Sequence, residues 1–267
     1  MNKLSIAISG CAIAVILCAS QCNNDSHQTG SSRPGTAETK PQTTPTEAPA
    51  MQPEQPATTT VQAETPAAGT RIKITTPYGS MTAVLYDDTP LHRANFLKLV
   101  DQKYYDGLLW HRCMKGFMVQ GGDPDSRNAP PGKSLGMGGP GYKVKAEFNA
   151  KHVHKKGALA AARSGAGNPE RESSGSQFYI VQGKPMTDAE IAQTEMMVGT
   201  RSPGFKYTDA QKLAYKTIGG SGWLDMDYTV FGEVTEGFNV IDSLAAQPVD
   251  AAHRPFKDIT MKIERMK

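Results

Sequence analysis

Short apolar runs separated by glycine-rich turns begin at residue 71, and this pattern predicts β-strands joined by hairpins. The first two runs, RIKITTP at 71–77 and MTAVLY at 81–86, flank a Tyr78-Gly79-Ser80 turn and predict a hairpin. Later apolar runs predict further strands at 108–114, 117–120, 157–163, 176–182, 228–234 and 257–267.

Two segments instead have apolar residues at helical spacing. The stretch LHRANFLKLVDQKYY at 91–105 predicts a helix that Thr89 caps, with Pro90 in its first turn. The stretch GFNVIDSLAAQ at 237–247 predicts a second helix.

Residues 183–222 carry a separate helical pattern. Thr187 with Glu190, and Thr208 with Gln211, each form a capping-box pattern, which predicts an inserted pair of helices. Seven or eight strands with two other helices, and no regular alternation of the two, argue against a doubly wound parallel sheet. We therefore expect a mainly β fold, a closed antiparallel barrel capped by two helices with a helical insertion.

The N-terminal 22 residues have the layout of a secretory signal. Lys3 precedes an apolar stretch of 16 residues at 4–19, and small residues follow before Cys22. The alternative is an uncleaved membrane anchor, although such a stretch falls short of the roughly 18 residues that span a bilayer. We expect an exported protein.

The end of this segment, ASQC, resembles the lipobox of bacterial lipoproteins, in which the cysteine becomes the lipidated first residue. Cys11, in ISGC, fits the letters better but has a shorter apolar run before it. We therefore expect lipidation at Cys22 and a position in the cell envelope, anchored to the membrane through that lipid.

Residues 23–70 contain no Phe, Trp, Tyr, Ile or Leu and are rich in Thr, Pro, Ala, Gln and Ser. Such a segment cannot bury enough apolar surface to fold. As a flexible tether it would span roughly 40 Å between the membrane and the domain at 71–267.

Charge and motifs exclude several classes of function. A net charge of +3 without a basic arm disfavours nucleic acid as a partner. Gly132-Lys133-Ser134 lacks the earlier glycine of a phosphate-binding loop, because Arg127 stands there. Lysines surround His152 and His154, so we interpret them as a solvated basic turn, and we expect no metal and no cofactor. Cys113 is the only thiol after Cys22, with a packing role favoured over a redox role.

The stretch WHRCMKGFMVQGGD combines an arginine with apolar residues in two short strands. An extended second strand would place Met118 and Gln120 on one side of the sheet and Phe117 and Val119 on the other. One face would then hold Arg112, an amide and apolar surface.

Four segments together resemble the cyclophilin family of peptidyl-prolyl cis-trans isomerases, in the family's order: HRCMKGFMVQGGDP, GMGGPGY, GALAAAR with SSGSQFYIVQG, and WLDMDYTVFGEVTEGFNVID. The resemblance covers nearly all of 71–267. It implies an eight-stranded barrel with a helix at each end and a proline-binding groove on the outer face.

The resemblance implies that Arg112 is catalytic and that Gln120 orders Arg112 or the substrate carbonyl. The positions that it assigns to the groove are Phe117, Met118, Ala162, Gln177, Tyr179, Trp223, Leu224 and Tyr228. The chain departs from the pattern at Tyr179, where a Phe is usual, at Tyr228, where many members have His, and at Arg163, where an Asn contacts the peptide backbone. The insertion before Trp223 could narrow substrate choice or cover the site.

The predicted activity is isomerisation of Xaa-Pro bonds in unfolded or folding proteins, by a monomer. Three alternatives remain open. Arg112 could be a structural residue paired with Glu147 or Asp123, the groove could bind proline peptides without turnover, or the domain could only dock to an envelope partner.

Overall fold

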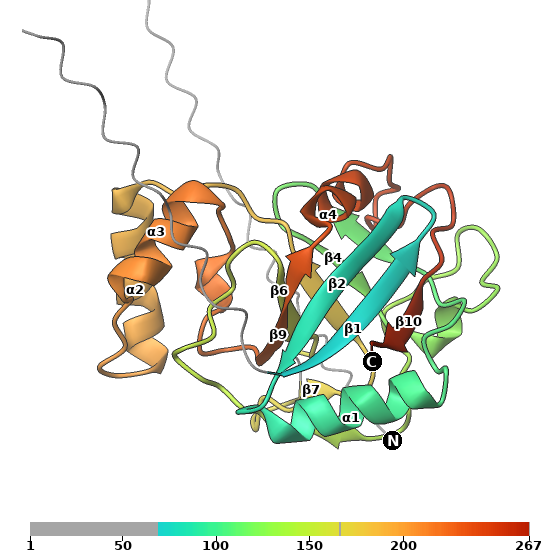
Figure 1. Ribbon diagram of the computed structural model, residues 1–267, viewed down its shortest axis with the longest axis horizontal. Coiled ribbons are helices and arrows are strands. Elements are labelled where there is room, and N and C mark those ends of the chain that lie inside the picture. Colours follow the sequence, from blue (N-terminus) through green and yellow to red (C-terminus); the bar gives the residue numbers. More distant parts are fainter. Residues whose placement is uncertain (1–68, 166, 267) are drawn as a thin grey trace, which may run out of the picture. The chain divides into compact units, whose positions relative to one another are not determined.

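A strongly curled antiparallel sheet forms the centre of the computed structural model, which describes residues 69–165 and 167–266 (Figure 1). The predicted signal segment 1–22, the predicted lipidation site Cys22 and the linker up to residue 68 lie outside the described residues. The first strand begins at Gly69, two residues before the predicted start of the domain.

The sheet has eight strands in the order β10-β1-β2-β9-β6-β8-β4-β3, and all neighbouring pairs are antiparallel. Its strands are β1 (Gly69–Thr76), β2 (Gly79–Tyr86), β3 (Arg112–Met114), β4 (Met118–Gly121), β6 (Ala158–Ala161), β8 (Phe178–Val181), β9 (Val230–Glu236) and β10 (Lys262–Arg265). A separate ribbon joins β5 (Lys143–Val144) to β7 (Ser173–Ser174). The predicted hairpin is β1–β2, and the other strands are shorter than or shifted from the predicted runs.

The prediction of a closed barrel is wrong, because the sheet is an open half-barrel. Its edge strands β3 and β10 have only three and four residues and do not pair with each other. The segments that precede β3 and β10 contact each other instead, at an isolated β-bridge between Leu109 and Thr260. There Trp110 N donates to Ile259 O at 2.9 Å. Strands this short cannot overlap over the length that a closing ladder needs.

Four α-helices accompany the sheet in the part of the chain that the structure describes. Helix α1 (Pro90–Asp101) and helix α4 (Phe238–Ala245) pack at opposite ends of the sheet, whereas α2 (Asp188–Arg201) and α3 (Asp209–Thr217) lie together to one side of it (Figure 1). Short 3₁₀ turns occur at Pro124–Ser126 (η1) and Gly222–Leu224 (η2). Among the described residues, no helix combines the length and the apolar character needed to cross a bilayer.

The first helix begins at Pro90, directly after Thr89, as predicted, but the Thr89 side chain does not cap it. Thr89 makes no capping hydrogen bond, and the carboxylate of Glu147 accepts from the backbone N–H groups of Leu91 and His92 at 3.0 and 2.9 Å. This carboxylate also meets His92 Nδ1 at 2.6 Å. A negative charge at a helix N-terminus is favourable, so Glu147 replaces a local cap from a distant segment.

Both capping boxes predicted in the insertion are confirmed. The hydroxyls of Thr187 and Thr208 accept from the N–H groups of Glu190 and Gln211, whose side chains reach back to the cap N–H groups. The helices then close over a small core of their own, which consists of Val153, Ile191, Val198, Phe205, Tyr207 and Tyr215.

The two faces of the sheet carry different clusters, because side chains alternate along each strand. On β8, Phe178 and Ile180 point into the main core inside the curl, together with residues of α1 and α4. Tyr179 and Val181 point to the outer face, where they join Met118 of β4 and Leu224 of η2 in a second apolar cluster. The outer cluster is the floor on which the candidate site is built.

His111, just before β3, is a buried polar residue in this frame. Its side chain is 4% exposed, and neither ring nitrogen has a hydrogen-bond partner among the described residues. Burial lowers the pKa of His111 from 6.5 to about 4, so the folded protein holds the ring neutral. Burial likewise lowers the pKa of His92.

We predict that acid weakens the fold through His111. Below pH 6.5 the unfolded chain takes up a proton on this ring that the folded chain refuses until about pH 4. The free energy of unfolding should therefore fall by up to about 3 kcal/mol as the pH decreases across this window. Urea unfolding of the wild type and of His111→Gln between pH 4 and 7.5 measures the effect. The variant should show a shallower pH dependence, and parallel curves would contradict the prediction.

Candidate active site

The register of four strands places the candidate residues side by side. Arg112 on β3 lies opposite Gln120 on β4, Gln120 lies opposite Tyr179 on β8, and Tyr179 lies opposite Ala160 on β6. Directly opposed residues in antiparallel strands share a face of the sheet. The row therefore runs across the outer face, from a guanidinium through an amide to an aromatic ring.

A chain of side-chain hydrogen bonds fixes the polar end of this row. Arg112 Nη1 donates to Gln120 Oε1 at 3.3 Å, and Gln120 Nε2 donates to Gln177 Oε1 at 3.0 Å. Gln177 Nε2 donates in turn to the carbonyls of Gly136 and Gly138 at 3.0 and 2.8 Å. The glycine-rich loop thus anchors both amides, and Gln120 presents its oxygen to Arg112.

Beside this chain lies a pocket of about 180 Å³ on the outer face. It brings together eight of the ten predicted site residues and one more side chain, Arg163; its lining consists of Arg112, Phe117, Met118, Gln120, Ala162, Arg163, Tyr179, Leu224 and Tyr228. The pocket is thus apolar on its floor and carries the arginine and the amide at its edge.

Phe117 does not follow the predicted alternation. Val119 points into the main core and Met118 to the outer face, as predicted. Phe117, however, also packs against the outer cluster, on the same side as Met118. The reason is that β4 begins only at Met118, and Phe117 belongs to the preceding turn, where its N–H donates to Met114 O at 3.0 Å.

The two remaining predicted residues flank the pocket without lining it. Trp223 is 42% exposed, and its ring centroid lies 5.4 Å from that of Phe117. Gln177 is buried behind Gln120 and reaches the pocket only through the bond to that amide.

Tyr179 places a hydroxyl at the edge of an apolar pocket, and this hydroxyl has a partner. It lies 2.9 Å from His154 Nε2, and burial raises the pKa of Tyr179 well above its usual range. The prediction of a solvated basic turn is therefore wrong for His154, which is fully buried and has both ring nitrogens bonded, Nδ1 to Asp225 and Nε2 to Tyr179. The prediction does not hold for His152 either: its ring stacks on that of Tyr86 with the centroids 3.8 Å apart, and its Nε2 lies 2.6 Å from Asp88 Oδ1.

Arg163, at the position where the resemblance places a peptide-contacting asparagine, is engaged with neighbouring side chains. Its guanidinium pairs with Asp227 at 2.8 Å and lies over the ring of Tyr228, 4.4 Å from the centroid. Its Nε also donates to the Asp227 carbonyl at 3.1 Å. Arg163 therefore stiffens the wall that holds Tyr228.

Arg112 does not have the structural role considered above. Glu147 is bound to His92 and to the start of α1, and Asp123 accepts from the N–H groups of Asp125 and Gly136. Within residues 69–165 and 167–266, Arg112 forms no ion pair with a carboxylate and has one side-chain hydrogen bond, to Gln120. Its positive charge stays available at the edge of the pocket.

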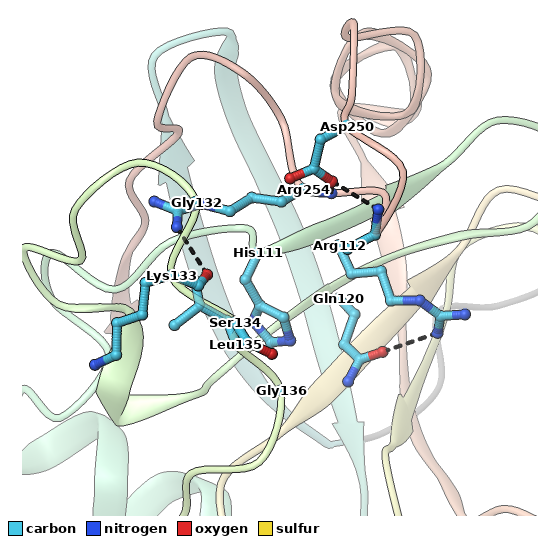
Figure 2. A pocket seen from close by; sticks show the side chains of 11 residues that line it. His111, Arg112, Gln120, Gly132, Lys133, Ser134, Leu135, Gly136, Asp250 and Arg254 are labelled. Atoms are coloured by element: carbon cyan, nitrogen blue, oxygen red, sulfur yellow. Dashed lines mark hydrogen bonds between the residues drawn. The ribbon is translucent and has the colours of Figure 1, made fainter.

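A second cavity, of about 380 Å³, lies on the other side of the Arg112–Gln120 pair. Figure 2 shows these two side chains joined at one edge of the cavity, with the His111 ring and the loop of Lys133 across from them. Arg254 closes it from above by donating to the Lys133 carbonyl at 3.1 Å. Because both cavities share Arg112 and Gln120, a ligand in either one would contact the same pair.

Other candidate chemistry receives no support from the geometry. Cys113 is 1% exposed, and burial raises its pKa to about 12, so the thiol packs in the core instead of reacting. In the part of the chain that the structure describes, no three His, Cys, Asp or Glu side chains gather in a way that could hold a metal ion.

Sequence reasoning missed His154 and Asp225 as neighbours of the site. His154 was noticed only for its lysine neighbours, and Asp225 follows the matched Trp223 and Leu224 directly. A buried histidine needs a partner, but the partners here are 25 and 71 residues away, and no local pattern indicates them.

Comparison with known proteins agrees with this geometry. Residues 71–267 match the family model described as cyclophilin type peptidyl-prolyl cis-trans isomerase/CLD. A Staphylococcus saprophyticus protein named as a peptidyl-prolyl cis-trans isomerase is 34% identical over 206 residues, which are 75% of this chain and 94% of the relative. A Streptococcus pyogenes protein named as a bifunctional phosphatase/peptidyl-prolyl cis-trans isomerase is 34% identical over 73% of this chain. The match spans only 38% of that longer relative.

Solved structures show the same fold. The crystal structure of a Cryptosporidium parvum cyclophilin type peptidyl-prolyl cis-trans isomerase aligns with a TM-score of 0.51 and 24% identity. The alignment covers 74% of this chain and 98% of the other. The protein is therefore an isomerase, and it belongs to the family of cyclophilin-type peptidyl-prolyl cis-trans isomerases.

Proposed function

We propose that the protein accelerates cis-trans exchange of Xaa-Pro bonds by stabilising a twisted amide with Arg112 while the proline ring sits in the 180 Å³ pocket. The observation that carries this proposal is a guanidinium that no carboxylate of the described residues pairs with, oriented by Gln120 at the edge of a pocket with an apolar floor. A relative of the same fold, from Cryptosporidium parvum, was crystallised in the presence of the dipeptide Ala-Pro, which supports a proline residue as the occupant.

The reaction breaks no σ bond and needs no cofactor. Its barrier of about 18–20 kcal/mol comes from amide resonance. As the bond rotates, the prolyl nitrogen loses conjugation and gains a localised lone pair, which accepts a hydrogen bond that the planar amide cannot accept well. A donor in the right place therefore stabilises the transition state more than the ground state. Arg112 has five N–H donors and keeps its charge. Among the described residues, one of these donors is bound, to Gln120, and the others remain for a substrate.

Arg112 cannot supply the whole effect alone. A 10⁵-fold acceleration requires about 7 kcal/mol, whereas one charge-assisted hydrogen bond contributes about 1.5–3 kcal/mol. The remainder has to come from positioning and from exclusion of water. Phe117, Met118, Tyr179 and Leu224 are the side chains that would hold the proline ring, and Gln120 would order Arg112 or the substrate carbonyl.

We further propose that the enzyme works in the cell envelope as an exported, monomeric lipoprotein that acts on proline-containing segments of folding proteins. The signal-like segment 1–22 and the lipobox-like end at Cys22 support export and anchoring. A linker of residues 23–70 would let the domain reach clients about 40 Å from the membrane.

Replacing Arg112 tests the catalytic proposal. Arg112→Ala should lower the exchange rate of a short Xaa-Pro peptide by about 10- to 100-fold, the equivalent of one charge-assisted bond. Arg112→Lys should fall between the two, because an ammonium keeps the charge but loses the planar fork. Exchange NMR at equal concentrations of folded protein measures the rates.

Arg71→Ala is the matched control, because Arg71 forms a surface ion pair with Glu236 away from the groove. It should match the wild type. Full activity in Arg112→Ala would contradict the proposed role of Arg112. Peptide binding without any exchange, even in the wild type, would favour a proline-binding module.

Labelling the full-length chain tests the envelope proposal. In a bacterial host supplied with radioactive palmitate, the wild type and Cys11→Ser should incorporate label and fractionate with membranes, whereas Cys22→Ser should not be labelled. Loss of the label in Cys11→Ser with retention in Cys22→Ser would show that the lipid site was assigned to the wrong cysteine.

A further inference from the structure

A continuous chain of hydrogen bonds connects the inserted segment to the floor of the proline pocket. The hydroxyls of Tyr207 and Tyr215 donate to Asp225 Oδ2 at 2.7 and 2.6 Å. Asp225 Oδ1 accepts from the backbone N and from Nδ1 of His154 at 2.8 and 2.7 Å. His154 Nε2 then meets the Tyr179 hydroxyl at 2.9 Å.

Because these side chains are buried, each hydrogen bond of the chain has to be kept. None of its five side chains is more than 4% exposed, so water cannot replace a lost partner. A carboxylate only accepts, which places a hydrogen on His154 Nδ1. His154 Nε2 is bonded to the Tyr179 hydroxyl, so the imidazole ring is held at both nitrogens and in turn holds the phenol.

The inserted segment also holds the wall of the pocket. Arg201, the last residue of α2, donates from Nη2 to the Trp223 carbonyl at 2.7 Å, and its Nη1 lies 3.4 Å from Asp227 Oδ2. Gly222 leaves no room for a side chain, because a Cβ there would come within 2.9 Å of the Tyr207 hydroxyl. The insertion is therefore fastened to both the floor and the wall.

We propose that His154 and Asp225 are positioning residues of the isomerase, which fix the ring of Tyr179, and that Tyr207 and Tyr215 of the inserted segment set the geometry of the proline pocket through Asp225. This inference rests on the groove proposed above. In this proposal the insertion supports catalysis by fixing the shape of the pocket. The sequence had suggested instead that it could cover the site or narrow substrate choice.

The position of Tyr179 explains why its orientation matters. It is opposite Gln120 in the β4–β8 register, and Gln120 in turn orients Arg112. A shift of the aromatic ring would therefore move the proline ring relative to the guanidinium. Small misplacements of reacting groups lower the reaction rate strongly, because the acceleration from positioning requires a near-attack geometry.

A double-mutant cycle tests the proposal on the complete domain. Tyr207→Phe/Tyr215→Phe removes both donors to Asp225 Oδ2 but keeps both rings. In the wild-type background it should lower the exchange rate at saturating peptide by about threefold to tenfold. In a Tyr179→Phe background, where the hydroxyl that ends the chain is missing, the same pair of changes should have an effect within about 1.5-fold.

Two further measurements separate positioning from folding. Tyr78→Phe, which removes a phenol bond to Gln247 outside the groove, should leave the exchange rate unchanged. The ¹⁵N resonance of His154 Nε2 should shift in Tyr179→Phe, because its hydrogen-bond partner is gone. If the double variant does not fold, the cycle is run with Tyr207→Phe alone.

Equal loss of exchange in the two backgrounds would overturn the proposal, because the tyrosines would then act without Tyr179. A failure of the proposed function itself gives a different result, namely no exchange by the wild type. In that case the cycle is measured on the dissociation constant of a proline peptide. Coupling there would support the positioning role, and additivity would refute it.

Discussion

The groove depends on one hydrogen-bonded chain, which runs from the Arg112 guanidinium through Gln120 and Gln177 to the carbonyls of Gly136 and Gly138. Each side-chain amide both accepts and donates a hydrogen bond, so neither amide group can rotate by 180° without losing a bond. The chain keeps a guanidinium, which no carboxylate of the described residues neutralises, beside an apolar pocket. Arginine is suited to this place because it remains charged even where water is scarce.

The rest of the fold supplies the surroundings of that chain. Period-2 alternation places one set of apolar residues inside the curled sheet and a second set under the groove, so a single strand such as β8 contributes to both. The open edge between β3 and β10 does not weaken this arrangement, because Arg112 is held through β4 and the glycine-rich loop. In our account, the insertion secures the opposite side of the pocket through Asp225.

Much of this could be predicted from the sequence, and the failures have a common physical cause. Alternation correctly placed Met118 and Val119, and the capping boxes correctly marked both inserted helices. The failures involve partners that are distant in sequence. Glu147 caps a helix more than 50 residues earlier, and Asp225 bonds the buried ring of His154 from 71 residues away. The prediction of a closed barrel failed for the same reason, because no local pattern encodes whether the two edge strands of the sheet, β3 and β10, pair with each other.

Chemical rescue tests the central claim, that a guanidinium at the position of Arg112 stabilises the twisted amide, most directly. The exchange rate of an Xaa-Pro peptide would be measured by NMR with Arg112→Ala in dilute guanidinium or methylguanidinium, and in ammonium at equal ionic strength. The account predicts that the guanidinium ions restore part of the lost rate and that ammonium restores less. Equal rates in all three salts would show that Arg112 acts by holding the structure and not by donating to the substrate.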